Sequence, residues 1–197
     1  MNKIIYIFVF IYFNIVTMES QNLETAVMGG GCFWCLEAIF QNLEGVEKVE
    51  SGYSGGDVEF PTYEAVCTGA TNHAEVVRIT YNPEKISYEQ LLNVFFATHD
   101  PTTLNRQGND VGTQYRSVIY YQNEEQKNIA NEIIDILTKN EVFTNPIVTE
   151  VAAAEIFYNA ELNHKDYYNL NKNQPYCQYV IAPKVLKFKH QFKELLK

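Results

Sequence analysis

The sequence predicts an α+β fold of the ferredoxin-like type, a split βαβ core followed by a C-terminal αβ extension. Two observations support this prediction. Segments in which apolar residues alternate and segments in which they recur at helical spacing follow one another as strand, helix, strand, strand, helix, strand. In addition, no repeat, charge block or low-complexity linker interrupts the 197-residue chain after Gln21. Residues 21–197 are therefore expected to form one domain around one core.

The first three elements lie between residues 25 and 53. Residues 25–28 are a short strand that ends at the glycine run 29–31, and a helix begins at Cys32. Its apolar face is made by residues at helical spacing, namely Phe33, Leu36, Phe40 and Leu43. Gly45 is expected to end this helix, and residues 46–53 alternate as the second strand.

A change of period marks the next strand and helix. The third strand places alternate residues on one face, namely Glu75, Val77, Ile79 and Tyr81. Ser87 and Gln90 form a capping-box pattern, which predicts a helix that runs up to His99.

The last elements follow a long polar loop. Residues 116–121 are expected to form the fourth strand of the core. Asn123 caps a helix that runs to about Lys139, and residues 147–151 form the strand that completes the αβ extension. The basic residues of the tail, 184–197, are spread around a terminal helix, which is typical of a solvated face.

The overall charge argues against a nucleic-acid partner. The formal net charge is -9 at pH 7, whereas phosphate binding depends on clustered Lys and Arg.

The first residues differ in kind from the rest. Lys3 precedes an apolar run over residues 4–13, and polar residues follow from Glu19. The run is too short to cross a bilayer, so we expect a signal peptide over residues 1–20 and export to a periplasm or the medium. Met18 is larger than the small residue that cleavage sites prefer, so an uncleaved membrane anchor is the alternative.

The chain has four cysteines, too few for a disulfide scaffold at this size: Cys32, Cys35, Cys67 and Cys177. A structural zinc site would need a second close pair of Cys or His ligands, and the four histidines are scattered. We therefore expect no metal and no cofactor.

Cys32 is the main candidate for a nucleophile. It follows three glycines and begins a helix, where unpaired backbone N–H groups and the helix dipole are expected to lower the pKa of its thiol. Phe33 and Trp34 could line a pocket for an apolar group. The alternatives are that Cys32 is a small buried core residue and that both aromatic rings belong to the core.

Cys35 completes a CxxC pattern, the spacing of thioredoxin-like redox motifs. This pattern supports a rival function, a thiol–disulfide oxidoreductase. A third hypothesis is an exported binding module in which the cysteines are inert.

Glu75 is the candidate acid. Its register with Val77 and Ile79 directs it toward an apolar environment, which raises the pKa of a carboxyl group and suits a proton donor. The alternative is a glutamate at a strand end that faces solvent. The loop over residues 99–117 is long for a compact domain and therefore a candidate for function, although its acids lack the spacing of a calcium loop.

Several motifs in one order resemble the A-type peptide methionine sulfoxide reductases. They are Gly30-Gly31-Cys32-Phe33-Trp34, Gly52-Tyr53-Ser54-Gly55-Gly56, Pro61-Thr62-Tyr63, His73-Ala74-Glu75, and the segment from Arg106-Gln107-Gly108 through Ser117. The likeness covers nearly everything after the leader, and several motifs in one order are far more specific than any one of them.

The resemblance implies reduction of methionine sulfoxide, free or in proteins, with preference for the S epimer. Cys32 is then the residue that attacks the sulfoxide sulfur, becomes a sulfenic acid and releases methionine, and Glu75 is the protonating acid. The other implied site residues are Tyr63 and Tyr115 at the sulfoxide oxygen, Asp110 on the polar side, and Phe33 with Trp34 at the methyl group.

The resemblance also implies a recycling route, in which a resolving cysteine forms a disulfide that thioredoxin or a similar dithiol protein opens. Cys177 matches the C-terminal position of such a cysteine and is favoured, and Cys35 is the alternative. The chain departs from many members, which have Gly in place of Cys35 and a glycine-rich tail with another cysteine instead of residues 179–184. Cys67 is expected to be structural, the remaining histidines to be surface or hydrogen-bonded residues, and the protein to be a monomer.

Overall fold

The computed structural model describes residues 22–197, and the predicted signal peptide over residues 1–20 lies outside the described residues. A six-stranded mixed sheet forms the centre of the molecule, with the strand order β7-β6-β1-β3-β2-β8. The strands are β1 (Glu24–Gly30), β2 (Val46–Ser54), β3 (Ala74–Tyr81), β6 (Ser117–Tyr121), β7 (Glu150–Ala153) and β8 (Tyr158–Asn159).

The four central strands confirm the split βαβ core. Strand β1 pairs antiparallel with β3 and with β6, and β3 pairs antiparallel with β2. Strands β1 and β2 therefore run parallel with β3 between them, and α1 (Phe33–Phe40) connects them. The predicted extension is also present, because α4 (Glu124–Lys139) leads from β6 to β7, which pairs parallel with β6.

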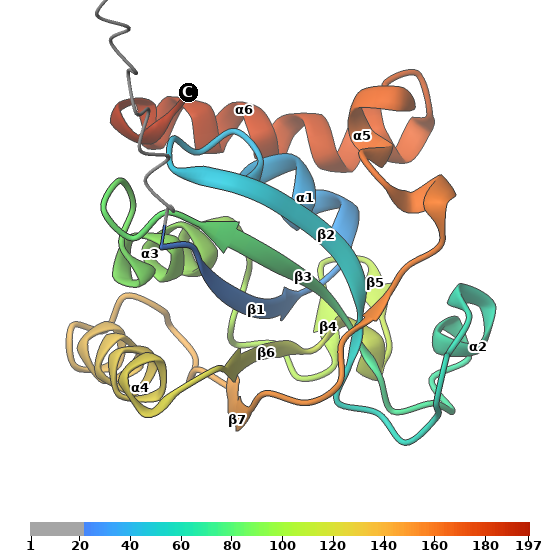
Figure 1. Cartoon of the computed structure of the whole chain (residues 1–197), viewed down its shortest axis with the longest axis horizontal. Helices are drawn as coiled ribbons and strands as arrows, with labels where there is room; N and C mark the ends of the chain where they lie inside the picture. The colour runs from blue at the N-terminus through green and yellow to red at the C-terminus, as the bar shows by residue number, and fades with distance from the viewer. Residues whose placement is uncertain (1–21) are drawn as a thin grey trace, which may run out of the picture.

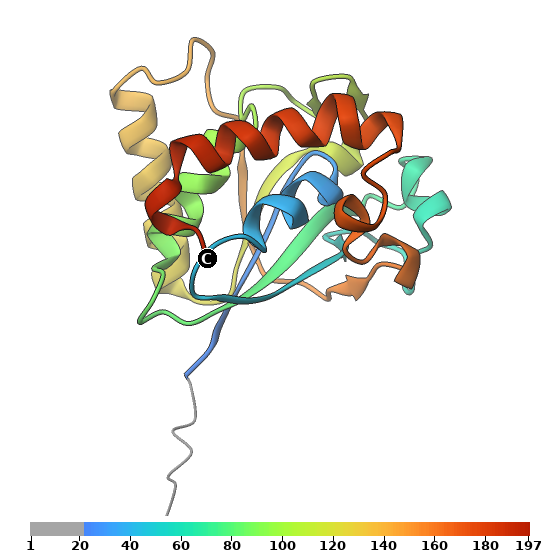
Figure 2. The ribbon, with the colours of Figure 1, turned by 90° about the horizontal axis from the view of Figure 1, so that it is seen from above.

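The helices α1, α3 (Tyr88–Thr98), α4 and α6 (Ala182–Gln191) pack on one face of the sheet (Figures 1 and 2). The capping box predicted at the start of α3 is present, with Ser87 and Gln90 bonded reciprocally. The main core lies between these helices and the sheet, and it includes Cys32, Cys35 and Cys177. All three thiols are therefore shielded by the same helical layer.

The other face of the sheet carries a smaller cluster. Its buried members are Val27, Ala74, Val76, Val118 and Tyr120, with Ala152 and Phe157 packed against them. The two faces of β3 thus divide as its period-two pattern predicts, with Val77 and Ile79 in the main core and Val76 in the smaller cluster.

Two predicted boundaries are wrong, and in both places the backbone bonds elsewhere. Helix α1 ends at Phe40 rather than near Gly45, because the N–H groups of Asn42 and Leu43 bond to carbonyls three residues back as tight turns, and Glu44 then donates to the carbonyl of Leu195. Strand β7 begins at Glu150 rather than Ile147, because the N–H of Val148 donates to the carbonyl of Pro101 and not to the sheet.

Several short elements lie in segments where no regular pattern predicts them. The two polar loops hold α2 (Tyr63–Cys67), a hairpin of β4 (Arg106–Gln107) and β5 (Asp110–Val111), and the 3-10 helix η1 (Thr113–Tyr115). After β8 the chain forms η2 (Leu162–His164), α5 (Tyr167–Leu170) and the π-helical turn η3 (Cys177–Ile181), and the 3-10 turn η4 (Lys193–Leu195) follows α6. Within residues 22–197, none of the helices has the length and apolar character that a membrane span requires.

Candidate active site

Cys32 lies at the turn between β1 and α1, where glycines let the chain pass close to other elements. Gly31 has a φ of 95°, and a Cβ added at Gly30 would lie 2.9 Å from the ring of Phe95. Cys32 is the N-cap residue of α1, and only 7% of its surface is exposed. The predicted nucleophile is therefore nearly buried, with its backbone fixed by the sheet on one side and the helix on the other.

The pKa of the Cys32 thiol is raised well above its usual value, so the predicted lowering is wrong for this structure. Burial is the largest cause, and the Cys35 thiol and the charge of Glu75 act in the same direction. The first backbone N–H of α1 is also occupied, because Phe33 donates it to Oε2 of Glu75 at 3.0 Å. The helix end therefore binds the carboxyl group of Glu75 and not the thiol of Cys32.

Glu75 is buried at the start of β3, as its register with Val77 predicts, and 1% of its surface is exposed. Burial raises the pKa of its carboxyl to about 8, and the charges of Asp110 and Cys35 raise it further, whereas the N–H of Phe33 opposes the shift. Glu75 is therefore mostly protonated at pH 7, which is the form that a proton donor needs.

Tyr63 and Tyr115 approach this carboxyl from α2 and η1, and both are half-buried. Burial and the charge of Glu75 raise the pKa of each phenol, so both keep the proton that a hydrogen bond to an oxygen requires. The two elements are linked by Gln114, whose Nε2 donates to the carbonyl of Cys67 at 3.4 Å. The structure thus brings both predicted tyrosines to the acid.

The aromatic side of the site is larger than the sequence indicates. Phe33 is fully buried, while the half-buried ring of Trp34 stacks on Tyr167 with centroids 3.7 Å apart and planes 7° apart. The indole N–H donates to Nδ1 of His164 at 3.1 Å, and the His164 ring lies 4.5 Å from the ring of Tyr63.

His164 and Tyr167 were not predicted as site residues. His164 is buried and hydrogen-bonded, which agrees with one of the two expectations for it, but its place against Trp34 was missed. The two residues lie about 130 positions after Trp34, and no local pattern links them to it. Only the packing of α5 and η2 against α1 reveals their position.

Asp110 lies in β5 and binds Tyr176, which the sequence did not predict as a site residue. Its Oδ2 accepts a hydrogen bond from Oη of Tyr176 at 2.6 Å. The same hydroxyl lies against the thiols of Cys32 and Cys35, and the charge of Asp110 acts on Glu75. Asp110 therefore orders the polar side of the site through Tyr176.

The two candidate resolving cysteines are both buried, Cys35 beside the nucleophile and Cys177 near Cys35. The Cys35 backbone N–H donates to the carbonyl of Cys32 at 3.0 Å, and a hydrogen bond between the two thiols lowers the pKa of Cys35 and raises that of Cys32. Cys177 opens η3, and burial together with the charge of Cys35 raises the pKa of its thiol. Cys67, expected to be structural, is exposed at the end of α2. Across residues 22–197, no three Cys, His, Asp or Glu side chains are grouped to hold a metal ion.

Glu37, one helical turn after Phe33, holds the loop that carries the rings of His164 and Tyr167 packed on Trp34. It is buried, and its Oε1 accepts the N–H of Asp166 at 3.1 Å. Asp166 has a left-handed φ of 50° and precedes Tyr167 in α5. Burial raises the pKa of Glu37 to about 7, so its ionisation occurs in the neutral range.

Comparisons with known proteins agree with this geometry. Residues 24–196 match the family model described as peptide methionine sulfoxide reductase. The protein named peptide methionine sulfoxide reductase MsrA from Nitratiruptor sp. is 58% identical over 173 residues, which cover 88% of this chain and 98% of that protein.

Solved structures share the fold. Mxr1 from Saccharomyces cerevisiae in reduced form has a TM-score of 0.75 and 30% identity, covering 83% of this chain and 94% of that one. The structure of Mxr1 in complex with Trx2 has a TM-score of 0.53 and 20% identity, covering 78% of this chain and 91% of that one. At this identity the comparison shows only that the two chains have the same fold. By its sequence, its fold and the residues gathered around Cys32, this chain belongs to the peptide methionine sulfoxide reductase family, A type.

Proposed function

We propose that this protein reduces methionine S-sulfoxide, free or in oxidised proteins, to methionine and so repairs oxidative damage. The observation that carries the proposal is the pairing of a nearly buried thiol, Cys32, with a carboxyl group that is neutral at pH 7, Glu75. A nucleophile, a proton donor and an apolar aromatic wall are the groups that removal of a sulfoxide oxygen requires.

The reaction proceeds by attack of the Cys32 sulfur on the sulfoxide sulfur. Glu75 gives its proton to the sulfoxide oxygen, and the thiol proton of Cys32 replaces the one that Glu75 loses. The oxygen then passes to Cys32 as a sulfenic acid while the substrate leaves as methionine, so Cys32 is oxidised and the substrate is reduced by two electrons. Tyr63 and Tyr115 stabilise the oxygen as its charge grows.

Selectivity for one epimer follows from the two sides of the site. A sulfoxide sulfur is a stereocentre that carries a methyl group, an oxygen, the rest of the side chain and a lone pair. Trp34, backed by the buried ring of Phe33, offers an apolar surface for the methyl group, while Tyr63 and Tyr115 offer O–H donors for the oxygen. When the position of the methyl group, the position of the oxygen and the direction of attack are all fixed, the R epimer would place its oxygen against the apolar surface of Trp34 and away from the O–H donors.

Recycling requires a second thiol. Attack of the Cys177 thiol on the sulfenic acid forms a disulfide and releases water, and a dithiol protein then reduces that disulfide and is itself oxidised. Cys35 is the alternative resolving residue, since its thiol is paired with Cys32. The complex of yeast Mxr1 with Trx2 supports a thioredoxin as the reductant here.

One assay tests the activity against the rival thiol–disulfide oxidoreductase. The purified chain is incubated with each epimer of methionine sulfoxide and dithiothreitol, and in parallel with insulin disulfides and no sulfoxide. Methionine from the S epimer alone is the expected result. Insulin reduction without any methionine release would favour the rival activity of the CxxC pattern.

The resolving cysteine is assigned by peptide mass mapping after one turnover without reductant. A Cys32–Cys177 disulfide is expected, and a Cys32–Cys35 disulfide would reassign the step. Export by the predicted leader and a monomeric state are further parts of the proposal. N-terminal sequencing of the mature protein from fractionated cells, and its mass in solution, test them.

A further inference from the structure

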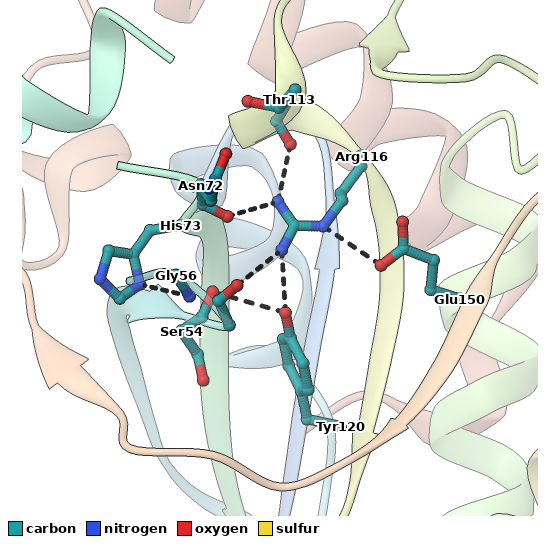
Figure 3. Close-up of polar contacts among 9 residues, drawn as sticks. Ser54, Gly56, Asn72, His73, Thr113, Arg116, Tyr120 and Glu150 are labelled. Carbon is teal, nitrogen blue, oxygen red and sulfur yellow. Dashed lines mark hydrogen bonds and ion pairs between the residues drawn. The ribbon is translucent and has the colours of Figure 1, made fainter. Parts of the chain in front are cut away.

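Arg116, between η1 and β6, is a buried cation that takes no part in the proposed chemistry. Its side chain is 11% exposed, and every one of the five N–H donors of its guanidinium has an acceptor (Figure 3). The acceptors are the carbonyls of Gly55 (3.4 Å), Asn72 (3.0 Å) and Thr113 (3.0 Å), the hydroxyl of Tyr120 (3.0 Å) and the carboxylate of Glu150 (3.3 Å).

The three carbonyls come from three separate segments around the site. Gly55 directly follows β2, Asn72 precedes β3 and stands three residues before Glu75, and Thr113 opens η1 two residues before Tyr115. The guanidinium therefore joins the segment that carries the acid to the segment that carries a hydrogen-bond donor. The Nη1 atom alone bridges these two, because it donates to both Asn72 and Thr113.

The carbonyl contacts matter more than the ion pair. The carboxylate of Glu150 is 51% exposed, and an exposed pair of this kind contributes little to stability. Carbonyl dipoles that converge from several segments repel one another, and without a donor they would remain unsatisfied in a buried place. The fork of the guanidinium holds them at a fixed spacing, which a single-centre ammonium group does not reproduce.

We propose that Arg116 is a positioning residue that sets the distance between the proton donor Glu75 and the hydroxyl of Tyr115. The inference rests on the proposed function, because both groups act on the sulfoxide oxygen only in that reaction. Arg116 acts through its backbone acceptors and does not touch the substrate.

Arg116→Lys is the variant that tests this role. Lysine keeps the charge but has three donors, so at least two of the five acceptors lose their partner. Misplacement of a reacting group by about 1 Å costs up to about 100-fold in rate, and we expect a fall of at least about 10-fold in the single-turnover rate of methionine release. Binding of the substrate should change by less than about 3-fold, because Phe33 and Trp34 stay in place.

A double-mutant cycle distinguishes positioning from general structural damage. If Arg116 acts through Tyr115, Arg116→Lys should cost less than about 3-fold in a Tyr115→Phe background, since the hydroxyl it positions is already absent. The matched control is Arg78→Lys. Arg78 lies on the face of β3 opposite Glu75, and it binds Glu50 and Asn159. Its effect should therefore be below about 2-fold and equal in both backgrounds.

The measurement is S-epimer methionine release in one turnover, with thermal unfolding recorded for each variant. An unchanged rate in Arg116→Lys, or an equal loss in both backgrounds, would overturn the inference while the wild-type activity upholds the proposed function. A wild-type chain that releases no methionine would overturn both. If Arg116→Lys does not fold, Tyr120→Phe removes one acceptor of the same guanidinium and keeps the buried ring. It should lower the rate by about 2- to 3-fold with the same dependence on Tyr115.

Discussion

The two halves of the site are held in different ways. The β3 ladder fixes the backbone of Glu75, while Cys32 follows the end of β1 and caps α1, where its carbonyl accepts the N–H of Cys35. The opposite half is the C-terminal loop, residues 158–176, which carries His164, Tyr167 and Tyr176 and has little regular structure. Its first residues pair with β2 as strand β8, and the rest is attached by side-chain contacts to α1 and by Glu161, which accepts from Tyr53 and Tyr63. The reacting groups thus sit on the rigid half, and the side chains that support Trp34 and Asp110 sit on the other, which we call the adaptable half.

This difference leads to a general expectation. Changes in the sheet-borne half should act on the rate of the chemical step, because they alter reacting groups. Changes in the C-terminal loop should act on substrate binding, because they alter the fit of a surface. The following variants test this division, from the largest expected effect to the smallest.

Cys32→Ser should remove activity, with a loss of at least about 1,000-fold in methionine release, because a serine hydroxyl is a far weaker nucleophile than a thiol near neutral pH. Cys67→Ser is the matched control, since Cys67 is exposed and outside the core that holds the other three cysteines, and a serine hydroxyl can replace its thiol as the hydrogen-bond partner of Tyr63. It should keep nearly full activity. Substantial turnover in Cys32→Ser would remove Cys32 from the nucleophile's role.

Glu75→Gln should lower the rate of the reductive step by about 100-fold, a typical loss for a general acid. The carboxyl has a pKa of about 8, so the acid form is present below that pH and is lost above it. The wild-type rate should therefore fall as the pH rises through about 8, and the variant should lack that fall. A single-turnover pH profile measures both, and the same alkaline fall in Glu75→Gln would assign it to another group.

The same substitution should make the protein more stable at neutral pH. Burial raises the Glu75 pKa from 4.5 to about 8, so folding keeps a proton that the unfolded chain releases, and stability declines as the pH rises from about 4.5 to about 8. At pH 7 this costs on the order of 3 kcal/mol, which a neutral glutamine that still accepts the Phe33 N–H avoids. Denaturant unfolding at pH 4 and pH 7 checks it. An equal stability difference at both pH values would contradict the linkage.

Tyr167→Ala tests the adaptable half. The stacked ring supports Trp34, and aromatic pairs contribute about 0.5–1.5 kcal/mol beyond their buried area. The KM for the sulfoxide should rise by about 3- to 10-fold while kcat changes little. Steady-state kinetics measure both, with Tyr168→Ala, the neighbour in α5, as the control. A fall in kcat without a change in KM would break the division between the two halves.

Glu37→Gln should have the smallest effect. The Glu37 carboxyl has a pKa of about 7, so it is neutral below that pH, and its ionisation above it weakens the attachment of the C-terminal loop. We expect the wild-type KM to rise by about 2-fold between pH 6 and pH 8 and the variant's KM to stay constant. An identical rise in Glu37→Gln would show that another group is responsible.

The same division explains what the sequence could predict. The sheet, the order of its elements and the burial of Glu75 follow from alternation and caps, which are local patterns. The end of α1 was misplaced because residues 42 and 43 form tight turns instead of continuing the helix, and the start of β7 because residue 148 bonds to a distant carbonyl. The pKa of Cys32 was predicted in the wrong direction, since it depends on burial and on Glu75, 43 residues away.

The C-terminal loop shows the limit most clearly. His164 and Tyr176 reach the site through tertiary packing alone, and neither belongs to a periodic segment. Cys177 was found only through the resemblance to a family. Arg116 belongs to one of the motifs that resemble the family, but its five acceptors come from distant segments that only the fold brings together. The spacing of residues in the sequence therefore could not predict them.

The most direct test of Cys32 as the nucleophile is one turnover in a Cys35→Ser/Cys177→Ser double variant without reductant. This chain has no buried thiol left to resolve the sulfenic acid, so the reaction should stop after its first step. We expect about one methionine per chain from the S epimer and a mass gain of about 16 Da on the peptide that contains Cys32, the addition of one oxygen atom. Absence of methionine with an intact Cys32, or oxygen on another residue, would contradict the account.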